Sequence, residues 1–170
     1  MSYSTIKLYH HPLSGHCHRV RLFLSILGIS TELINVDLMQ AEHKTAAFLE
    51  KNSLGQVPVI DDNGFVLADS TAILVYVAKK YGSEFWLPND AVGAAQVQRW
   101  LSIASGPIAQ GPAVARLITV FGAKYNPEET IARAHHVLKV IELSLDNRDY
   151  LVGTAPTIAD IATYTYVAHA

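Results

Sequence analysis

The stretch from Gly55 to Tyr76 constrains the fold most, because it predicts strand, turn, strand and helix in direct succession. Val57-Pro58-Val59-Ile60 is β-branched around a proline, and proline cannot donate to a sheet ladder, so this strand should start at Pro58 or lie at a sheet edge. Asp61-Asp62-Asn63-Gly64 is typical of a hairpin turn, and Phe65–Ala68 of a short apolar strand. The stretch therefore predicts an antiparallel hairpin that leads into a helix.

The start of that helix is a candidate ligand site. Asp69 or Ser70 should cap it, and a helix N-terminus attracts anions, while the Asp69 carboxylate can hold an ammonium group. A cis Val57–Pro58 bond would turn the Val57 amide and carbonyl outward, toward an extended peptide. Capping alone is the commoner role of such residues. An α-amino acid carries both charges, however, so the segment suits one.

Composition limits the classes of function. Half of the 170 residues are apolar, 16% are charged, and the formal net charge is −2. The chain can therefore bury a core, and it lacks the basic stripe that nucleic acid or an anionic membrane would need. It shows no export signal and no long apolar run, and the single cysteine, Cys17, allows no internal disulfide. We expect a cytoplasmic protein that binds neither nucleic acid nor membrane.

Apolar periodicity divides the chain into an α/β half and a helical half. Expected strands lie at 6–9, 31–37, 58–60 and 65–68, and expected helices at about 14–28, 45–51 and 70–82. This β-α-β-α-β-β-α order predicts a parallel crossover unit followed by a hairpin, and hence a mixed sheet covered by helices. We expect a domain at 1–83, a linker at 84–90 and an all-helical domain at 91–170.

The helical half carries several signals for where helices start, end or bend. Gly106-Pro107 and Gly111-Pro112 interrupt its first helical pattern, which predicts a bend or a break. Asn126-Pro127-Glu128-Glu129 combines a cap, an N1 proline and an acidic first turn. Thr157-Ile158-Ala159-Asp160 is similar to a capping box, with Asp in place of the usual Glu or Gln. These signals predict at least three helical segments.

Ser14 lies where the first strand passes into the first helix. At a helix N-terminus its hydroxyl can donate to an anion, and a thiolate held there would also feel the helix dipole. Lowering a thiol pKa of about 8.5 by one or two units creates a large thiolate population at neutral pH. Ser14 is therefore a candidate for activating a bound thiol, although simple capping is commoner. Cys17 is either a rival nucleophile or an inert, half-buried thiol.

A cluster of histidines around Cys17 raises the question of a metal site. Its members are His10, His11, His16 and His18. Adjacent histidines, and pairs two apart on a helix, point to different sides, and no Cys-x-x-Cys or His-x-x-x-His pairing is present, so we expect no metal. Arg19 and Arg21 on the same helix should be solvated or paired with carboxylates.

Five motifs run from one end of the chain to the other. They are Ser14-Gly15-His16-Cys17-His18-Arg19-Val20-Arg21, Glu42-His43-Lys44, Leu54-Gly55-Gln56-Val57-Pro58, Asp69-Ser70 and Thr157-Ile158-Ala159-Asp160. In this order the chain resembles the cytosolic glutathione S-transferases of serine type, which include theta, zeta and phi classes and similar bacterial members. The resemblance implies a thioredoxin-like N-terminal domain that binds glutathione and an all-α C-terminal domain that lines the second-substrate pocket.

The resemblance also implies roles for individual residues. Ser14 matches the catalytic serine, and Tyr9 is a rival from the tyrosine-type classes. The residues implied to bind glutathione are His43, Lys44, Gln56, Val57, Pro58, Asp69 and Ser70. The first two match contacts to the glycyl carboxylate, the middle three the segment along the cysteinyl backbone, and the last two the pair that grips the γ-glutamyl end. Glutathione would be a co-substrate, with no further cofactor.

This chain departs from the family pattern at two points. Asp69 is shorter than the usual Glu, which would loosen the ammonium contact. The chain ends at Ala170 inside its last helix, where family members continue, so we expect the helical domain to be incomplete at its C-terminus.

The expected activity is attack of activated glutathione on a small electrophile. Glutathione-dependent disulfide or peroxide reduction is an alternative, as is a non-catalytic binding or scaffold protein, because one fold supports several functions. We also expect a homodimer, since Trp86, Trp100 and the helices starting at Ser70 and Ala91 present more apolar surface than one chain should cover.

Overall fold

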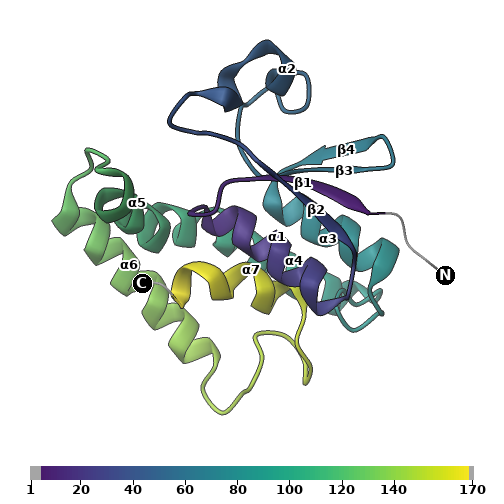
Figure 1. Ribbon diagram of the computed structural model, residues 1–170. Helices are drawn as coiled ribbons and strands as arrows, with labels where there is room; N and C mark the ends of the chain where they lie inside the picture. Colours follow the sequence, from purple (N-terminus) through teal and green to yellow (C-terminus); the bar gives the residue numbers. More distant parts are fainter. Residues whose placement is uncertain (1–4, 169–170) are drawn as a thin grey trace. The chain divides into compact units, whose positions relative to one another are not determined.

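The computed structural model describes residues 5–168. The chain forms two compact units, divided between Gly82 and Ser83. Strands occur in the first unit, and the described elements of the second are all helical (Figure 1). Within the described residues, no helix has the length and apolar character needed to cross a membrane. The predicted fold class, an α/β half followed by a helical half, is confirmed.

The first unit follows the predicted order, with one additional 3₁₀ turn. Its elements are β1 (Ile6–His10), α1 (Gly15–Ile26), β2 (Thr31–Asn35), η1 (Glu42–Lys44), α2 (Ala46–Leu49), β3 (Val59–Asp62), β4 (Phe65–Ala68) and α3 (Ser70–Tyr81). The sheet order is β2-β1-β3-β4, with β1 parallel to β2 and both remaining pairs antiparallel. β3 lies inside the sheet and starts directly after Pro58, so of the two placements predicted for this strand the first is correct.

The sheet buries residues on both faces. Helices α1 and α3 pack together on one face, and α2 lies on the other (Figure 1). Ile6 and Leu8 of β1 are fully buried. Tyr9, whose side chain alternates with theirs, packs instead against a separate small cluster of Val36, Phe48 and Val59. This two-sided covering is the thioredoxin-like arrangement predicted from the sequence.

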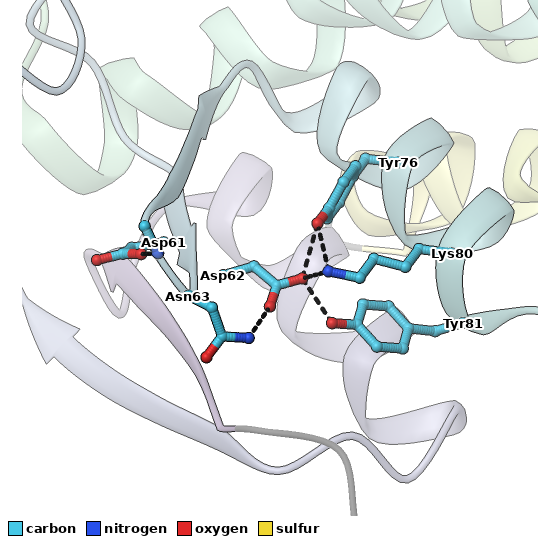
Figure 2. Close-up of polar contacts among 7 residues, drawn as sticks. Asp61, Asp62, Asn63, Tyr76, Lys80 and Tyr81 are labelled. Carbon is cyan, nitrogen blue, oxygen red and sulfur yellow. Dashed lines mark hydrogen bonds and ion pairs between the residues drawn. The ribbon is translucent and has the colours of Figure 1, made fainter.

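A buried carboxylate joins β3 to the last turns of α3 (Figure 2). The Asp62 side chain is fully buried, and its Oδ2 accepts hydrogen bonds from the Tyr76 hydroxyl at 2.7 Å, the Tyr81 hydroxyl at 2.5 Å and the Lys80 ammonium at 2.7 Å. Asn63 Nδ2 donates to the other oxygen at 3.0 Å. Burial raises the pKa of Asp62, but the bonds from Lys80, Tyr81 and Tyr76 together outweigh it and hold that pKa below its ordinary value.

The second unit contains the interrupted helix that the sequence predicts. Its elements are α4 (Ala91–Ser105), the π-helical turn η2 (Ala109–Ala113), α5 (Val114–Phe121), α6 (Pro127–Ser144) and α7 (Ile158–Val167). Asn126 caps α6 by accepting a bond from the Glu129 amide, as expected. The capping box is also confirmed, because Thr157 accepts from the Ala159 amide at 3.2 Å while Asp160 accepts from the Thr157 amide at 2.8 Å.

Both tryptophans lie inside the protein. Trp86 is 7% exposed and Trp100 is 3% exposed. The expectation that they form part of an uncovered apolar surface is therefore wrong, because the packing of this chain alone already buries them. Phe65 and Val66 of the edge strand β4 remain 47% and 40% exposed.

Candidate functional site

Ser14 is the N-cap of α1. Its Oγ accepts a hydrogen bond from the Cys17 amide at 3.3 Å, and its side chain is half-buried. A hydroxyl has one hydrogen and two lone pairs, so this cap bond occupies only a lone pair. The hydroxyl hydrogen can therefore be donated to an anion at the start of α1, where the helix dipole also favours negative charge.

Cys17 lies in the first turn of α1 and is only 2% exposed. Burial raises the pKa of its thiol above the ordinary value, and a hydrogen bond with Ser14 offsets this only in part. The thiolate is the reactive form of cysteine. The geometry thus favours the inert-thiol interpretation over a nucleophilic Cys17.

Tyr9 is engaged in the apolar cluster beside α2. Its ring meets that of Phe48 edge to face, with centroids 6.4 Å apart and an interplanar angle of 82°. The Lys51 ammonium lies 5.4 Å from the centre of the Tyr9 ring. Ser14, in contrast, caps a helix on the other face of the sheet.

Asp69 is the N-cap of α3 and adopts a positive φ of 72°. Its Oδ1 accepts bonds from the Thr71 and Ala72 amides, both at 2.9 Å, and from the Thr71 hydroxyl at 2.6 Å. Burial raises the pKa of Asp69, but these bonds outweigh it and hold the pKa below its ordinary value. Among residues 5–168 no donor bonds to Oδ2, so the ionised carboxylate keeps one oxygen for an ammonium group.

Ser70, the first residue of α3, is 5% exposed and contacts two side chains of α1. Arg19 Nη1 donates to Ser70 Oγ at 3.3 Å, and His16 Nδ1 lies 3.3 Å from the same oxygen. Burial, helped by the charge of Arg19, lowers the pKa of His16 to about 4, although Asp69 acts in the opposite direction. His16 is therefore neutral at pH 7. These contacts join the N-terminal turns of α1 and α3.

The sequence did not predict the buried contact of Arg19 with Ser70. The side chain is fully buried, so a solvated position is wrong for it. Arg19 lies four residues before Phe23, which was assigned to the buried face of the helix. That spacing places both side chains on one face and was the available signal.

The 3₁₀ turn η1 holds the loop that precedes β3. Lys44 Nζ donates to the carbonyls of Leu54 at 3.2 Å and Gly55 at 3.1 Å. Gly55 has a φ of +57°, and a Cβ there would lie 2.6 Å from the His43 carbonyl oxygen, so only glycine fits. Within the described chain the buried His43 Nδ1 has no hydrogen-bond partner. The structure thus brings His43 and Lys44 beside the Leu54–Pro58 motif.

The Val57–Pro58 peptide bond is cis. In the described part of the chain, neither the amide nor the carbonyl of Val57 has a hydrogen-bond partner. The neighbouring Gln56 carbonyl accepts from Asn52 Nδ2 at 2.8 Å, and the Gln56 side chain is exposed. Val57 therefore offers a donor and an acceptor to an extended ligand backbone. As for metal ions, residues 5–168 contain no group of three or more His, Cys, Asp or Glu side chains that could hold one.

Comparison with known families matches both halves of the chain. Residues 4–79 match the N-terminal domain of glutathione S-transferase, and residues 109–170 match its C-terminal domain. The chain belongs to the glutathione S-transferase family. The family predicted from the sequence motifs is thereby confirmed.

Individual transferases are similar over most of this glutathione S-transferase. It is 31% identical to glutathione S-transferase theta-1 of Bos taurus, over 96% of this chain and 72% of that protein. It is 36% identical to glutathione S-transferase 3 of Zea mays, over 91% of this chain and 73% of that protein.

Solved structures of transferases share its fold. The glutathione S-transferase of Pseudomonas fluorescens superposes with a TM-score of 0.90 at 34% identity, covering 98% of this chain and 84% of its own. A glutathione transferase homologue from Drosophila mojavensis was solved with bound glutathione. It gives a TM-score of 0.88 at 28% identity, and the match covers 96% of this chain and 76% of that chain.

Proposed function

We propose that this glutathione S-transferase activates glutathione through the Ser14 hydroxyl and adds the resulting thiolate to a small electrophile. The observation that carries the proposal is the cap geometry of Ser14, which leaves its hydrogen for an anion at the start of α1. A hydrogen bond to the thiolate favours the charged form and so lowers the thiol pKa. Membership of the transferase family supports the reaction class.

Glutathione would lie across the N-terminal unit. Its γ-glutamyl ammonium and carboxylate suit the free oxygen of Asp69 and the hydroxyl of Ser70. Its cysteinyl backbone suits the unpaired amide and carbonyl of Val57. Its glycyl carboxylate would then lie near His43 and Lys44, which are held beside the same loop. In this placement the thiol of glutathione would lie near the Ser14 hydroxyl.

A reductase that uses Cys17 is not favoured, because burial keeps that thiol protonated. A scaffold would not need the hydrogen-bonding groups described above, and the relatives named above are transferases. We further propose a cytoplasmic enzyme that uses glutathione as co-substrate without another cofactor. The division into 1–83, a linker at 84–90 and 91–170 is also part of the proposal.

Replacing Ser14 with alanine should cut turnover while leaving glutathione affinity largely intact. Without the hydroxyl, a thiol pKa lowered by one to two units returns to about 8.5, so the thiolate fraction at pH 7 falls by about 8- to 25-fold. Steady-state conjugation of a chlorinated nitrobenzene measures this effect. Cys17→Ala and Tyr9→Phe are the matched controls. A larger loss of turnover in either variant than in Ser14→Ala would show that Ser14 is not the activating residue.

We propose a homodimer, the commonest assembly of soluble chains. Phe65 and Val66 on the edge strand β4 offer exposed apolar area for an interface. Light scattering at micromolar concentration should give twice the mass of one chain, and Phe65→Lys should lower the dimer fraction. A single-chain mass for the unmodified protein would show that these side chains serve no self-association.

A further inference from the structure

We propose that Arg19 is a positioning residue for the α-carboxylate of the γ-glutamyl group and acts on it through the Ser70 hydroxyl. The inference rests on the proposed placement of that group at Asp69 and Ser70. It adds a residue that the sequence motifs leave without a role in binding. Arg19 would not touch glutathione, because it lies fully buried beneath Ser70.

The hydrogen-bond partners of Ser70 Oγ limit the groups to which its hydroxyl hydrogen can be donated. Arginine has only donors, so the 3.3 Å contact from Arg19 Nη1 must occupy a lone pair of Oγ. The hydroxyl hydrogen is then left for an acceptor. Without ligand that acceptor can be neutral His16 Nδ1, at 3.3 Å. With ligand it can be the substrate carboxylate.

His16 can follow this change without gaining charge. In neutral imidazole either ring nitrogen can carry the proton, so Nδ1 accepts in one tautomer and donates in the other. If Nδ1 donates, both lone pairs of Ser70 Oγ are filled, by Arg19 and His16. The single hydrogen of the hydroxyl is then left for the ligand. The charged donor also polarises the hydroxyl and strengthens the bond that it makes to an anion.

The charges at this end of α3 also favour a charged donor to Ser70. Ionised Asp69 attracts the substrate ammonium but repels the substrate carboxylate nearby. Neutral His16 cannot offset that repulsion. The guanidinium of Arg19 donates to Ser70 Oγ, and as a charged donor it strengthens the hydrogen bond that Ser70 makes to the substrate carboxylate. Arg19 thus lets the site accept both charges of one amino acid.

Kinetics of Arg19→Met test the proposal, because methionine keeps much of the volume and removes the donor and the charge. The glutathione KM should rise about tenfold, as expected for loss of a charge-assisted bond, while kcat at saturating glutathione should fall less than threefold. Arg19→Lys should recover part of the affinity. Val20→Ala, a cavity in the same buried part of α1, is the control for general loosening and should leave KM within twofold.

A double-mutant cycle with Ser70→Ala separates positioning from a structural role. If Arg19 acts through Ser70, Arg19→Met should change glutathione affinity less than twofold in the Ser70→Ala background. A full tenfold loss there, or an equal loss in Val20→Ala, would overturn the proposal. If Arg19→Met does not fold, Arg19→Lys is tested with a glutathione analogue that lacks the γ-glutamyl α-carboxylate. Arg19→Lys and the unmodified protein should bind this analogue with equal affinity. If Arg19→Lys instead loses as much affinity for the analogue as for glutathione, the role of Arg19 in positioning the carboxylate is refuted.

These outcomes remain distinct from failure of the proposed function. An unmodified protein that binds no glutathione would refute the function itself. An unmodified protein that binds glutathione, with Arg19→Met unchanged in KM, would refute only the role of Arg19.

Discussion

Asp62→Ala should destabilise the protein by about 2 to 3 kcal/mol, because several hydrogen bonds to one carboxylate are lost together. The two tyrosine hydroxyls and the Lys80 ammonium all donate to Asp62 Oδ2. Lys80 is 44% exposed and can return to water, so the cost stays below that of stranding a buried charge. Thermal unfolding should show a midpoint lowered by about 4 to 12 °C.

A neighbouring aspartate provides the matched control for this change. Asp61 lies beside Asp62 in β3, but its carboxylate accepts a bond from the Gly64 amide at 2.8 Å at the hairpin turn. Asp61→Ala should therefore cost about 1 kcal/mol or less. Equal losses for the two variants would mean that the buried cluster contributes no special stability.

The stabilisation that Asp62 provides should depend on pH. The folded-state pKa of Asp62 lies below its ordinary value, so its stabilisation is present at neutral pH and is lost as the pH falls through the folded-state pKa. The difference in unfolding free energy between the unmodified protein and Asp62→Ala should therefore shrink below about pH 4. Denaturant titrations at pH 7 and pH 3 measure it, and a difference that stays constant would contradict the assignment.

Glutathione affinity should fall at least about tenfold when Asp69 and Ser70 are both replaced by alanine. Hydrogen bonds to charged groups contribute about 1.5 to 3 kcal/mol each, and the change removes the partners of both the ammonium and the carboxylate. Titration calorimetry with glutathione measures the loss. Unchanged affinity in the double variant would place the γ-glutamyl end elsewhere.

Loss of a helix cap must be separated from loss of a ligand contact. Asp69→Asn keeps a capping side chain but removes the charge, so it should still weaken binding of the ammonium group. Asp90→Ala removes a comparable N-cap, whose Oδ1 accepts from the Gly93 amide at 2.8 Å, at the start of α4. We expect this control to lose stability while its glutathione affinity stays within twofold.

Local sequence patterns were sufficient for much of the fold. The hairpin of β3 and β4, the caps at Ser14 and Asn126 and the capping box at Thr157 depend on residues within a few positions of each other. Such short-range chemistry is visible in a sequence. The additional 3₁₀ turn η1 was missed, because three residues carry no measurable periodicity.

Contacts between distant segments were the part that sequence patterns could not supply. Asp62 was interpreted as a turn residue, yet its partners lie 14, 18 and 19 positions later in α3. Arg19 and Ser70 are 51 positions apart, and nothing in either local pattern indicates their contact. The burial of Trp86 and Trp100 likewise depends on tertiary packing. The candidate site was thus predictable as motifs, but not as a connected set of side chains.

The pKa of the glutathione thiol in the bound state tests the central proposal most directly. Thiolate absorbance, followed across pH in the presence of saturating protein, reports this value without an electrophile. We predict a pKa one to two units below the free value of about 8.5 with the unmodified protein, and a return toward that value with Ser14→Ala. An identical pKa of bound glutathione in both proteins would contradict activation by Ser14.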